Sequence, residues 1–168
     1  MKGIYLLLGS NLGNRERSLE RALEGISERV GEVCDRSSVY ESAPWGVEDQ
    51  PVYLNQVLKV ETELEPIELL RAVLAIEADM GRVRRKVWGA RVIDIDVLYY
   101  GNEIIRSREL QVPHPRLHER RFTLEPICEI APDETHPIFG LSQMELLDRC
   151  PDSLAVTKRI ETEVLEMA

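Results

Sequence analysis

The sequence has little of what marks a secreted, membrane-spanning or zinc-binding protein. Its three cysteines are far apart and form no C-x-x-C pair, so we expect neither a disulfide framework nor a zinc site. The longest clean apolar stretch near the N-terminus, Ile4 to Leu8, is too short to cross a bilayer, and no apolar segment with a small-residue cleavage site accompanies it. We therefore expect a cytoplasmic protein with reduced cysteines and no membrane association.

A net positive charge is absent too. The formal net charge is −9 at pH 7, which would repel the phosphate backbone of nucleic acid over most of the surface. The sign reverses in the segment 81–91, which contains no acid and holds five cations: Arg82, Arg84, Arg85, Lys86 and Arg91. Such a concentration of cations in an acidic chain indicates a small anionic ligand. Because the sequence has no G-x-x-x-x-G-K-[ST] loop, a P-loop kinase is excluded.

The length and the hydrophobic periodicity predict one α+β domain over residues 1–168. The predicted elements are strands over 3–8, 32–42, 52–62 and 91–100 and helices over 19–30 and 66–80. This order is that of a ferredoxin-like βαββαβ domain, an antiparallel sheet with helices packed on one face. Gly101-Asn102 predicts a turn into a short hairpin strand over 103–105, and a C-terminal extension with a short helix over 120–128 follows.

Two acids at alternate positions of the last predicted strand are candidate metal ligands. Asp94 and Asp96 stand at i and i+2, so their Cα atoms should lie roughly 6.5 Å apart on one face. A bare D-x-D pattern is more often a solvated strand face. Here the face also carries Val92 and Leu98, and like charges on a partly apolar face repel each other unless a cation lies between them. Carboxylate oxygens with open positions suit Mg²⁺, so metal binding and a solvated face are both open at this point.

The cationic segment favours a ligand beside these acids. Phosphoryl transfer needs positive charge where negative charge redistributes, and the planar fork of arginine fits phosphate oxygens in pairs. Arg91 lies three residues before Asp94, and we take it with Arg82 and Arg84 as a candidate phosphate ligand. A solvated charge run remains the alternative for Arg85 and Lys86.

Three further residues have weaker individual signals. Tyr53 and Asn55 share one face of their predicted strand, where they could stack on a flat ring and hydrogen-bond to its edge. His114 lies between two prolines in a predicted extended segment, although a lone histidine is more often structural than functional.

Five ordered motifs together carry a resemblance to a known family. They are G-S-N-L-G (9–13), G-V-E-D-Q-P-V-Y-L-N (46–55), G-R-V-R (81–84), W-G-A-R-V-I-D-I-D (88–96) and V-P-H-P-R-L-H-E-R-R-F (112–122). The sequence resembles the 6-hydroxymethyl-7,8-dihydropterin pyrophosphokinases of folate biosynthesis. The resemblance implies a ferredoxin-like fold and two Mg²⁺ ions. It also implies a reaction in which ATP, as co-substrate, gives its terminal two phosphates to the hydroxymethyl oxygen of the dihydropterin and leaves AMP.

The resemblance also implies roles for individual residues. Asp94 and Asp96 match the metal-binding acids, and Arg82 and Arg91 match arginines that act on the phosphates during catalysis. The implied pterin-binding residues are Ser42, Ala43, Trp45, Tyr53, Asn55, Trp88 and Phe122. The implied ATP-binding residues are Glu77, Arg82, Arg84, Arg91, His114 and Arg120. The sequence departs from many members at Ser42, Ala43 and Trp45 near the pterin, and at Glu109 and Gln111 near the nucleotide.

Two other functions share features with this sequence. RNA-recognition modules have the same element order, but they use an aromatic K/R-G-F/Y-G/A-F-V-x-F/Y strand that the sequence lacks. A nucleotidyltransferase of the polymerase-palm type also sets paired aspartates on such a sheet around two metals, and it would release pyrophosphate rather than AMP. The expected partners are ATP and 6-hydroxymethyl-7,8-dihydropterin, without nucleic acid, and we expect a monomer.

Overall fold

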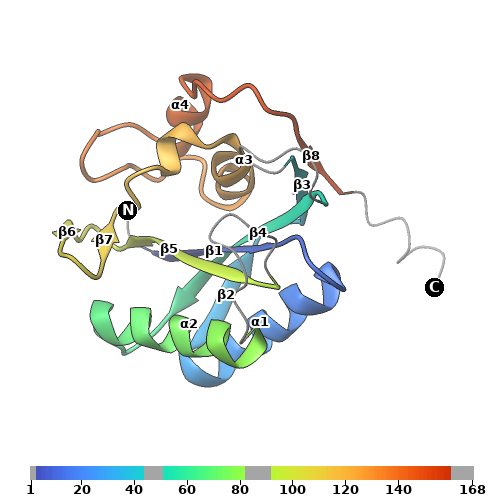
Figure 1. The fold of residues 1–168 in the computed structure, drawn as a ribbon. Coiled ribbons are helices and arrows are strands. Elements are labelled where there is room, and N and C mark those ends of the chain that lie inside the picture. Colours follow the sequence, from blue (N-terminus) through green and yellow to red (C-terminus); the bar gives the residue numbers. More distant parts are fainter. Residues whose placement is uncertain (1–2, 44–50, 82–91, 160–168) are drawn as a thin grey trace.

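The protein folds into an antiparallel sheet with helices on both faces, as seen in a computed structural model that describes residues 3–43, 51–81 and 92–159 (Figure 1). The strands are β1 (Ile4–Ser10), β2 (Glu32–Arg36), β3 (Tyr40–Ser42), β4 (Tyr53–Glu61), β5 (Asp94–Tyr100), β6 (Ile105–Arg106), β7 (Gln111–Val112) and β8 (Val156–Lys158). The helices are α1 (Arg15–Arg29), α2 (Pro66–Met80), α3 (Arg121–Ile130) and α4 (Gln143–Asp148), with a 3-10 turn η1 at Leu117–Glu119. The predicted ferredoxin-like fold class is confirmed.

The two long helices begin where the sequence carries capping signals. Asn14 precedes α1, and its side chain accepts a hydrogen bond from the backbone N–H of Arg17 at 3.2 Å. A capping box between Glu65 and Glu68, with Pro66 at the first helical position, starts α2. Both helices then cover the same face of the sheet. No helix in the described ranges is long and apolar enough to cross a membrane.

The alternation of side chains along each strand divides the interior into two cores. The first core lies under α1 and α2 and contains Leu6, Leu8, Leu54, Leu58, Ile95 and Val97. The second core lies under α3 and α4 and contains Tyr5, Leu7, Val57, Leu98, Leu124 and Ile127. Because Ile95 and Val97 face the first core, Asp94 and Asp96 lie on the face that α3 partly covers. This arrangement confirms the predicted split of the β4 and β5 side chains between two faces.

The structure differs from the sequence-based expectation at two strands. The predicted strand 32–42 is interrupted at Ser37, whose Oγ accepts the N–H of Val57 at 2.9 Å, so a side chain replaces part of the strand ladder. The short hairpin strand is Ile105–Arg106, and its partner is β7 rather than β5. The hairpin therefore stands apart from the main sheet as a separate two-stranded unit.

The C-terminal extension closes around a buried histidine. The Nδ1 atom of His136 accepts the backbone N–H groups of Ile138 at 3.1 Å and Phe139 at 3.2 Å, and its ring stacks on Phe139 with centroids 4.3 Å apart. Burial, aided by the nearby His118, lowers the pKa of His136 from 6.5 to about 4. His136 is therefore neutral in the folded chain over a pH range in which the unfolded chain binds a proton there.

We expect the free energy of unfolding to fall as the pH drops from 6.5 toward about 4. In this window the unfolded state binds more protons at His136 than the folded state does, so protonation favours unfolding, by at most roughly 1.4 kcal/mol per pH unit. Urea unfolding at pH 7, 6 and 5 measures the slope. The variant His136→Asn keeps an acceptor near the Nδ1 position but does not titrate, so its slope should be shallower. An identical slope in this variant would contradict the assignment.

Candidate active site

A row of paired residues across three strands forms the floor of the candidate site. Gly9 of β1 pairs with Asp94 of β5 on one side and with Asn55 of β4 on the other. Directly paired residues of antiparallel strands point to the same face, so Asp94 and Asn55 project together from positions two strand spacings, roughly 10 Å, apart. Gly9 places no side chain between them. No side chain of β1 therefore stands between the acid and the amide.

Gly9 also brings the polar end of Asn55 over this floor. A Cβ atom built at Gly9 would lie 3.5 Å from Asn55 Oδ1 and 3.8 Å from Tyr53 Cδ1. The Nδ2 of Asn55 donates to Ser42 Oγ at 2.7 Å, and both residues are buried. Because the amide nitrogen is engaged by Ser42, Oδ1 is the atom that faces the floor and can accept a hydrogen bond there.

The acid pair lies at the end of β5 that meets α2. Asp94 and Asp96 are half-buried, and the intervening Ile95 donates its backbone N–H to Glu77 Oε2 at 2.7 Å. β5 is an edge strand of the main sheet, so Glu77 satisfies an outward-pointing N–H group between the two acids. The described part of the chain contains no group of three or more potential metal ligands. The chemistry of two carboxylates on one strand face nevertheless fits Mg²⁺, which takes its remaining ligands from water and phosphate.

The described residues on either side of the cationic segment 82–91, Gly81 and Val92, lie next to each other. A Cβ atom at Gly81 would lie 3.3 Å from Val92 Cβ, so the residues that flank the segment are in contact. Gly81 ends α2 and donates its N–H to the Glu77 carbonyl at 2.9 Å. The described chain on both sides of this segment therefore lies near the start of β5.

A cation and an aromatic ring stand on the α3 side of the same face. The guanidinium carbon of Arg120 lies 5.5 Å from the centroid of the Phe122 ring. Burial lowers the pKa of Arg120, and the negative charge of Asp96 opposes this shift. Arginine stays protonated in proteins, so Arg120 brings a fixed positive charge within electrostatic reach of the acid pair.

His114 is hydrogen-bonded to β5 at a position after the two aspartates. Its backbone N–H donates to the Leu98 carbonyl at 2.9 Å, and Leu98 lies two residues after Asp96. Its Nδ1 accepts the N–H of Arg116 at 3.2 Å, so in the neutral ring Nε2 carries the proton. Burial, together with the charges of Arg120 and Arg116, lowers the pKa of His114 to about 4. At neutral pH the ring is an uncharged donor through Nε2.

The structure brings part of the predicted site together. Ser42, Tyr53, Asn55, Asp94, Asp96 and Phe122 belong to the elements that border one sheet face, with Ala43 exposed at its margin. Glu77 lies at the strand edge, and His114 and Arg120 precede α3. Trp45, Arg82, Arg84, Trp88 and Arg91 lie outside the described residues. The floor position of Gly9 was missed, because the sequence shows its G-S-N-L-G turn but not which strands flank it.

These features define an α+β domain with a polar sheet face that carries two aspartates and an amide. The sequence pattern of the family described as 7,8-dihydro-6-hydroxymethylpterin-pyrophosphokinase matches residues 5–132. The chain belongs to this family.

Named relatives agree with the family match. The 2-amino-4-hydroxy-6-hydroxymethyldihydropteridine pyrophosphokinase of Aquifex aeolicus is 46% identical over 83% of this chain and 86% of its own length. The enzyme of the same name from Haemophilus influenzae is 46% identical over 79% of this chain and 84% of its own length. A longer relative, the folic acid synthesis protein fol1 of Pneumocystis carinii, is 42% identical over 90% of this chain, which spans 20% of that protein.

A solved structure agrees with the fold. The chain of the wild-type Plasmodium falciparum HPPK-DHPS crystal structure superposes with a TM-score of 0.73 at 16% identity, over 88% of this chain and 44% of that one. At this identity the likeness supports the fold alone.

Proposed function

We propose that this chain transfers the terminal pyrophosphoryl group of ATP to the hydroxymethyl oxygen of 6-hydroxymethyl-7,8-dihydropterin. The products are the pterin diphosphate and AMP, and the step belongs to folate biosynthesis. Family membership supports the reaction. The observation that supports this assignment of the site is the row Asp94, Gly9 and Asn55, because it puts a carboxylate and an amide on one sheet face with no β1 side chain between them.

On the pterin side, three residues bind and orient the ring. Tyr53 and Phe122 stack on its two faces, and Asn55 Oδ1 accepts a hydrogen bond from its edge. Ser42 fixes the amide of Asn55 in the required orientation, as its 2.7 Å hydrogen bond to Nδ2 suggests. Ala43, Trp45 and Trp88 are proposed to border the same subsite on the strength of the sequence resemblance.

On the phosphate side, Asp94 and Asp96 would hold two Mg²⁺ ions. These ions, when bound, neutralise phosphate charge. Arg82, Arg84, Arg91 and Arg120 bind phosphate oxygens, and His114 donates its Nε2–H to the nucleotide. Glu77 holds β5 in place through Ile95, so its contribution to ATP binding is indirect. The pterin hydroxyl oxygen forms a bond to the β-phosphorus while the bond from that phosphorus to the α,β-bridging oxygen breaks, and AMP leaves with that oxygen. The hydroxyl proton passes to solvent.

Product analysis tests the reaction directly. Incubation of the full chain with MgATP and the dihydropterin should yield AMP and pterin diphosphate in equal amounts, and AMP should not appear when either substrate is left out. A nucleotidyltransferase would instead release inorganic pyrophosphate. Release of pyrophosphate, or AMP formation without the pterin, would overturn the proposal. We further propose a cytoplasmic monomer, which sedimentation analysis of the purified chain tests in part.

A further inference from the structure

The chain after α4 contacts two elements that border the proposed pterin subsite. We call residues 152–158 the C-terminal strap; the family pattern matches residues 5–132, so the strap lies beyond it. Asp152, the first residue of the strap, is hydrogen-bonded to the start of α3, and its last three residues form β8, which pairs with β3. Figure 1 shows the strap running past α3 to β8. The strap therefore links the helix that carries Phe122 with the strand that carries Ser42.

Asp152 caps α3 from a distant part of the chain. In the described part of the chain, the N-cap residue Arg120 makes no capping hydrogen bond with its side chain. Asp152, which is only 6% exposed, takes this role: its Oδ2 accepts the backbone N–H of Arg121, the first helical residue, at 3.1 Å. Its carbonyl oxygen also accepts Arg121 Nε–H at 3.0 Å. A carboxylate at this end of a helix is favoured by the helix dipole. Asp152 therefore fixes where α3 begins.

The anchored residue lies between two residues of the proposed site. Arg120 precedes Arg121 and Phe122 follows it, so a shift of the Arg121 backbone moves both neighbours. Pro126 lies inside α3 and lacks an N–H, so it cannot donate the usual helical hydrogen bond to the Phe122 carbonyl. The helix itself therefore holds the turn of Phe122 less firmly, and the bonds to Asp152 matter more.

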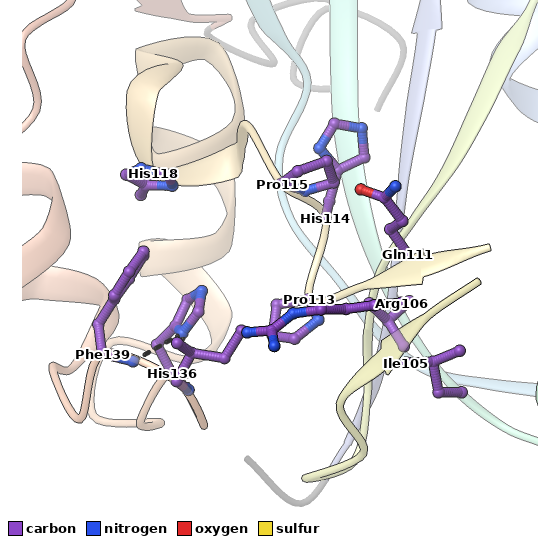
Figure 2. Close-up of a pocket in the computed structure, with 11 residues that line it drawn as sticks. Ile105, Arg106, Gln111, Pro113, His114, Pro115, His118, His136 and Phe139 are labelled. Carbon is purple, nitrogen blue, oxygen red and sulfur yellow. Dashed lines mark hydrogen bonds between the residues drawn. The ribbon is translucent and has the colours of Figure 1, made fainter. Parts of the chain in front are cut away.

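The segment that enters α3 has open space on one side. Figure 2 shows His114, Pro115 and His118 at the border of a pocket with a volume of about 270 Å³. Empty space supplies no packing contacts to the residues that line it. The position of the first turn of α3 therefore depends on its bonds to other segments, and Asp152 makes two of them.

The other end of the strap supports the floor of the same subsite. Val156 of β8 pairs with Ser42 of β3. Ser42 in turn pairs with Tyr53, and its Oγ accepts the Asn55 amide at 2.7 Å. By contacting both α3 and β3, the strap sets the position of the Phe122 ring relative to Tyr53 and Asn55.

From this arrangement we infer that Asp152 is a positioning residue for pterin binding. Its carboxylate holds the start of α3 so that the ring of Phe122 lies at stacking distance from the bound dihydropterin. Asp152 acts through Phe122 and does not touch the substrate. This inference rests on the proposed function, because it takes the dihydropterin to lie between Phe122 and Tyr53.

A double-mutant cycle tests the inference. Isothermal titration measures the affinity of the full chain for the dihydropterin in the presence of Mg²⁺ and α,β-methylene ATP, which lacks the bond that breaks in the reaction. Asp152→Asn removes the charge and one of two acceptor oxygens, and it should weaken pterin binding about tenfold. In a Phe122→Leu background the same change should weaken binding by about twofold or less, because the stacking ring is already missing.

A matched control and a second variant keep the test decisive. Asp148→Asn removes an equal charge from an exposed position at the end of α4 and should leave pterin affinity unchanged. Urea unfolding establishes that each variant is folded under the titration conditions. If Asp152→Asn is not folded, Arg121→Met replaces it, because it removes the hydrogen bond from Nε to the Asp152 carbonyl and keeps the backbone bond. Its smaller loss of affinity should also depend on the Phe122 ring.

The outcomes separate the inference from the proposed function. An equal loss of affinity with and without the Phe122 ring, or no loss at all, would refute the inference, because Asp152 would then not act through that ring. In that case AMP release by the wild-type chain still supports the pyrophosphokinase reaction. If the wild-type chain neither binds the dihydropterin nor releases AMP, both the proposed function and the inference are wrong. A loss that depends on the ring supports the inference.

Discussion

Replacing Asp96 with Asn is expected to lower the rate of pyrophosphoryl transfer by on the order of 10³. The two side chains have nearly the same shape, so the loss measures the removal of one negative charge from the proposed Mg²⁺ site. Asp96 is half-buried, and its negative charge favours the protonated form of Arg120. The substitution should therefore weaken both metal binding and the electrostatic attraction between residue 96 and Arg120.

Two measurements establish the role of Asp96. The rate of AMP release at saturating substrates should fall, and isothermal titration should show weaker binding of MgATP. The control is Asp133→Asn, which removes an equal charge from an exposed position in the loop after α3. Urea unfolding of both variants verifies that the fold is kept. Normal nucleotide affinity in Asp96→Asn would count against the metal assignment.

Arg82→Ala is expected to lower turnover by a similar factor, on the order of 10³, as for an arginine that stabilises developing phosphate charge. Arg82 itself lies outside the described residues. The case for it comes from its neighbours: Gly81 contacts Val92 at the start of β5, two residues before Asp94. Arg82 directly follows Gly81 in the sequence, and we propose that its charge acts mainly in the transition state.

The kinetic pattern distinguishes this role from a general charge effect. A group that acts in the transition state changes kcat, with a smaller change in the KM for ATP. Arg85→Ala removes the same charge from the same segment, and we expect it to change kcat far less. Equal losses in the two variants would indicate that the segment acts only through its net charge. Unchanged turnover in Arg82→Ala would remove this residue from the chemistry.

Local patterns in the sequence predicted much of the fold. The alternation around Asp94 and Asp96 predicted that both acids share one face, and the same pattern predicted the shared face of Tyr53 and Asn55. Helical spacing predicted both long helices. These features are set by residues a few positions apart, so the sequence displays them directly. The ordered motifs added the family, which the comparisons confirm.

The predictions were less accurate where a strand meets a distant partner. The strand over 32–42 is divided at Ser37 because this residue bonds to Val57, which is 20 positions away. The short strand Ile105–Arg106 pairs with Gln111–Val112 instead of β5. The extension also adds β8 beside β3, and Arg159 then reaches Glu16 at 2.6 Å, which is 143 positions distant. No local pattern encodes such pairings.

The acid pair likewise combines local features with features that depend on distant segments. By itself the sequence determined that Asp94 and Asp96 project from one face of a strand, next to a segment rich in arginine, because strand periodicity is a local property of the chain. Only the tertiary structure decided what lies beside these acids: Gly9 and Asn55 in register, Arg120 near Asp96, and His114 bonded to Leu98. These neighbours depend on strand order and register, which arise from packing between segments far apart in the sequence.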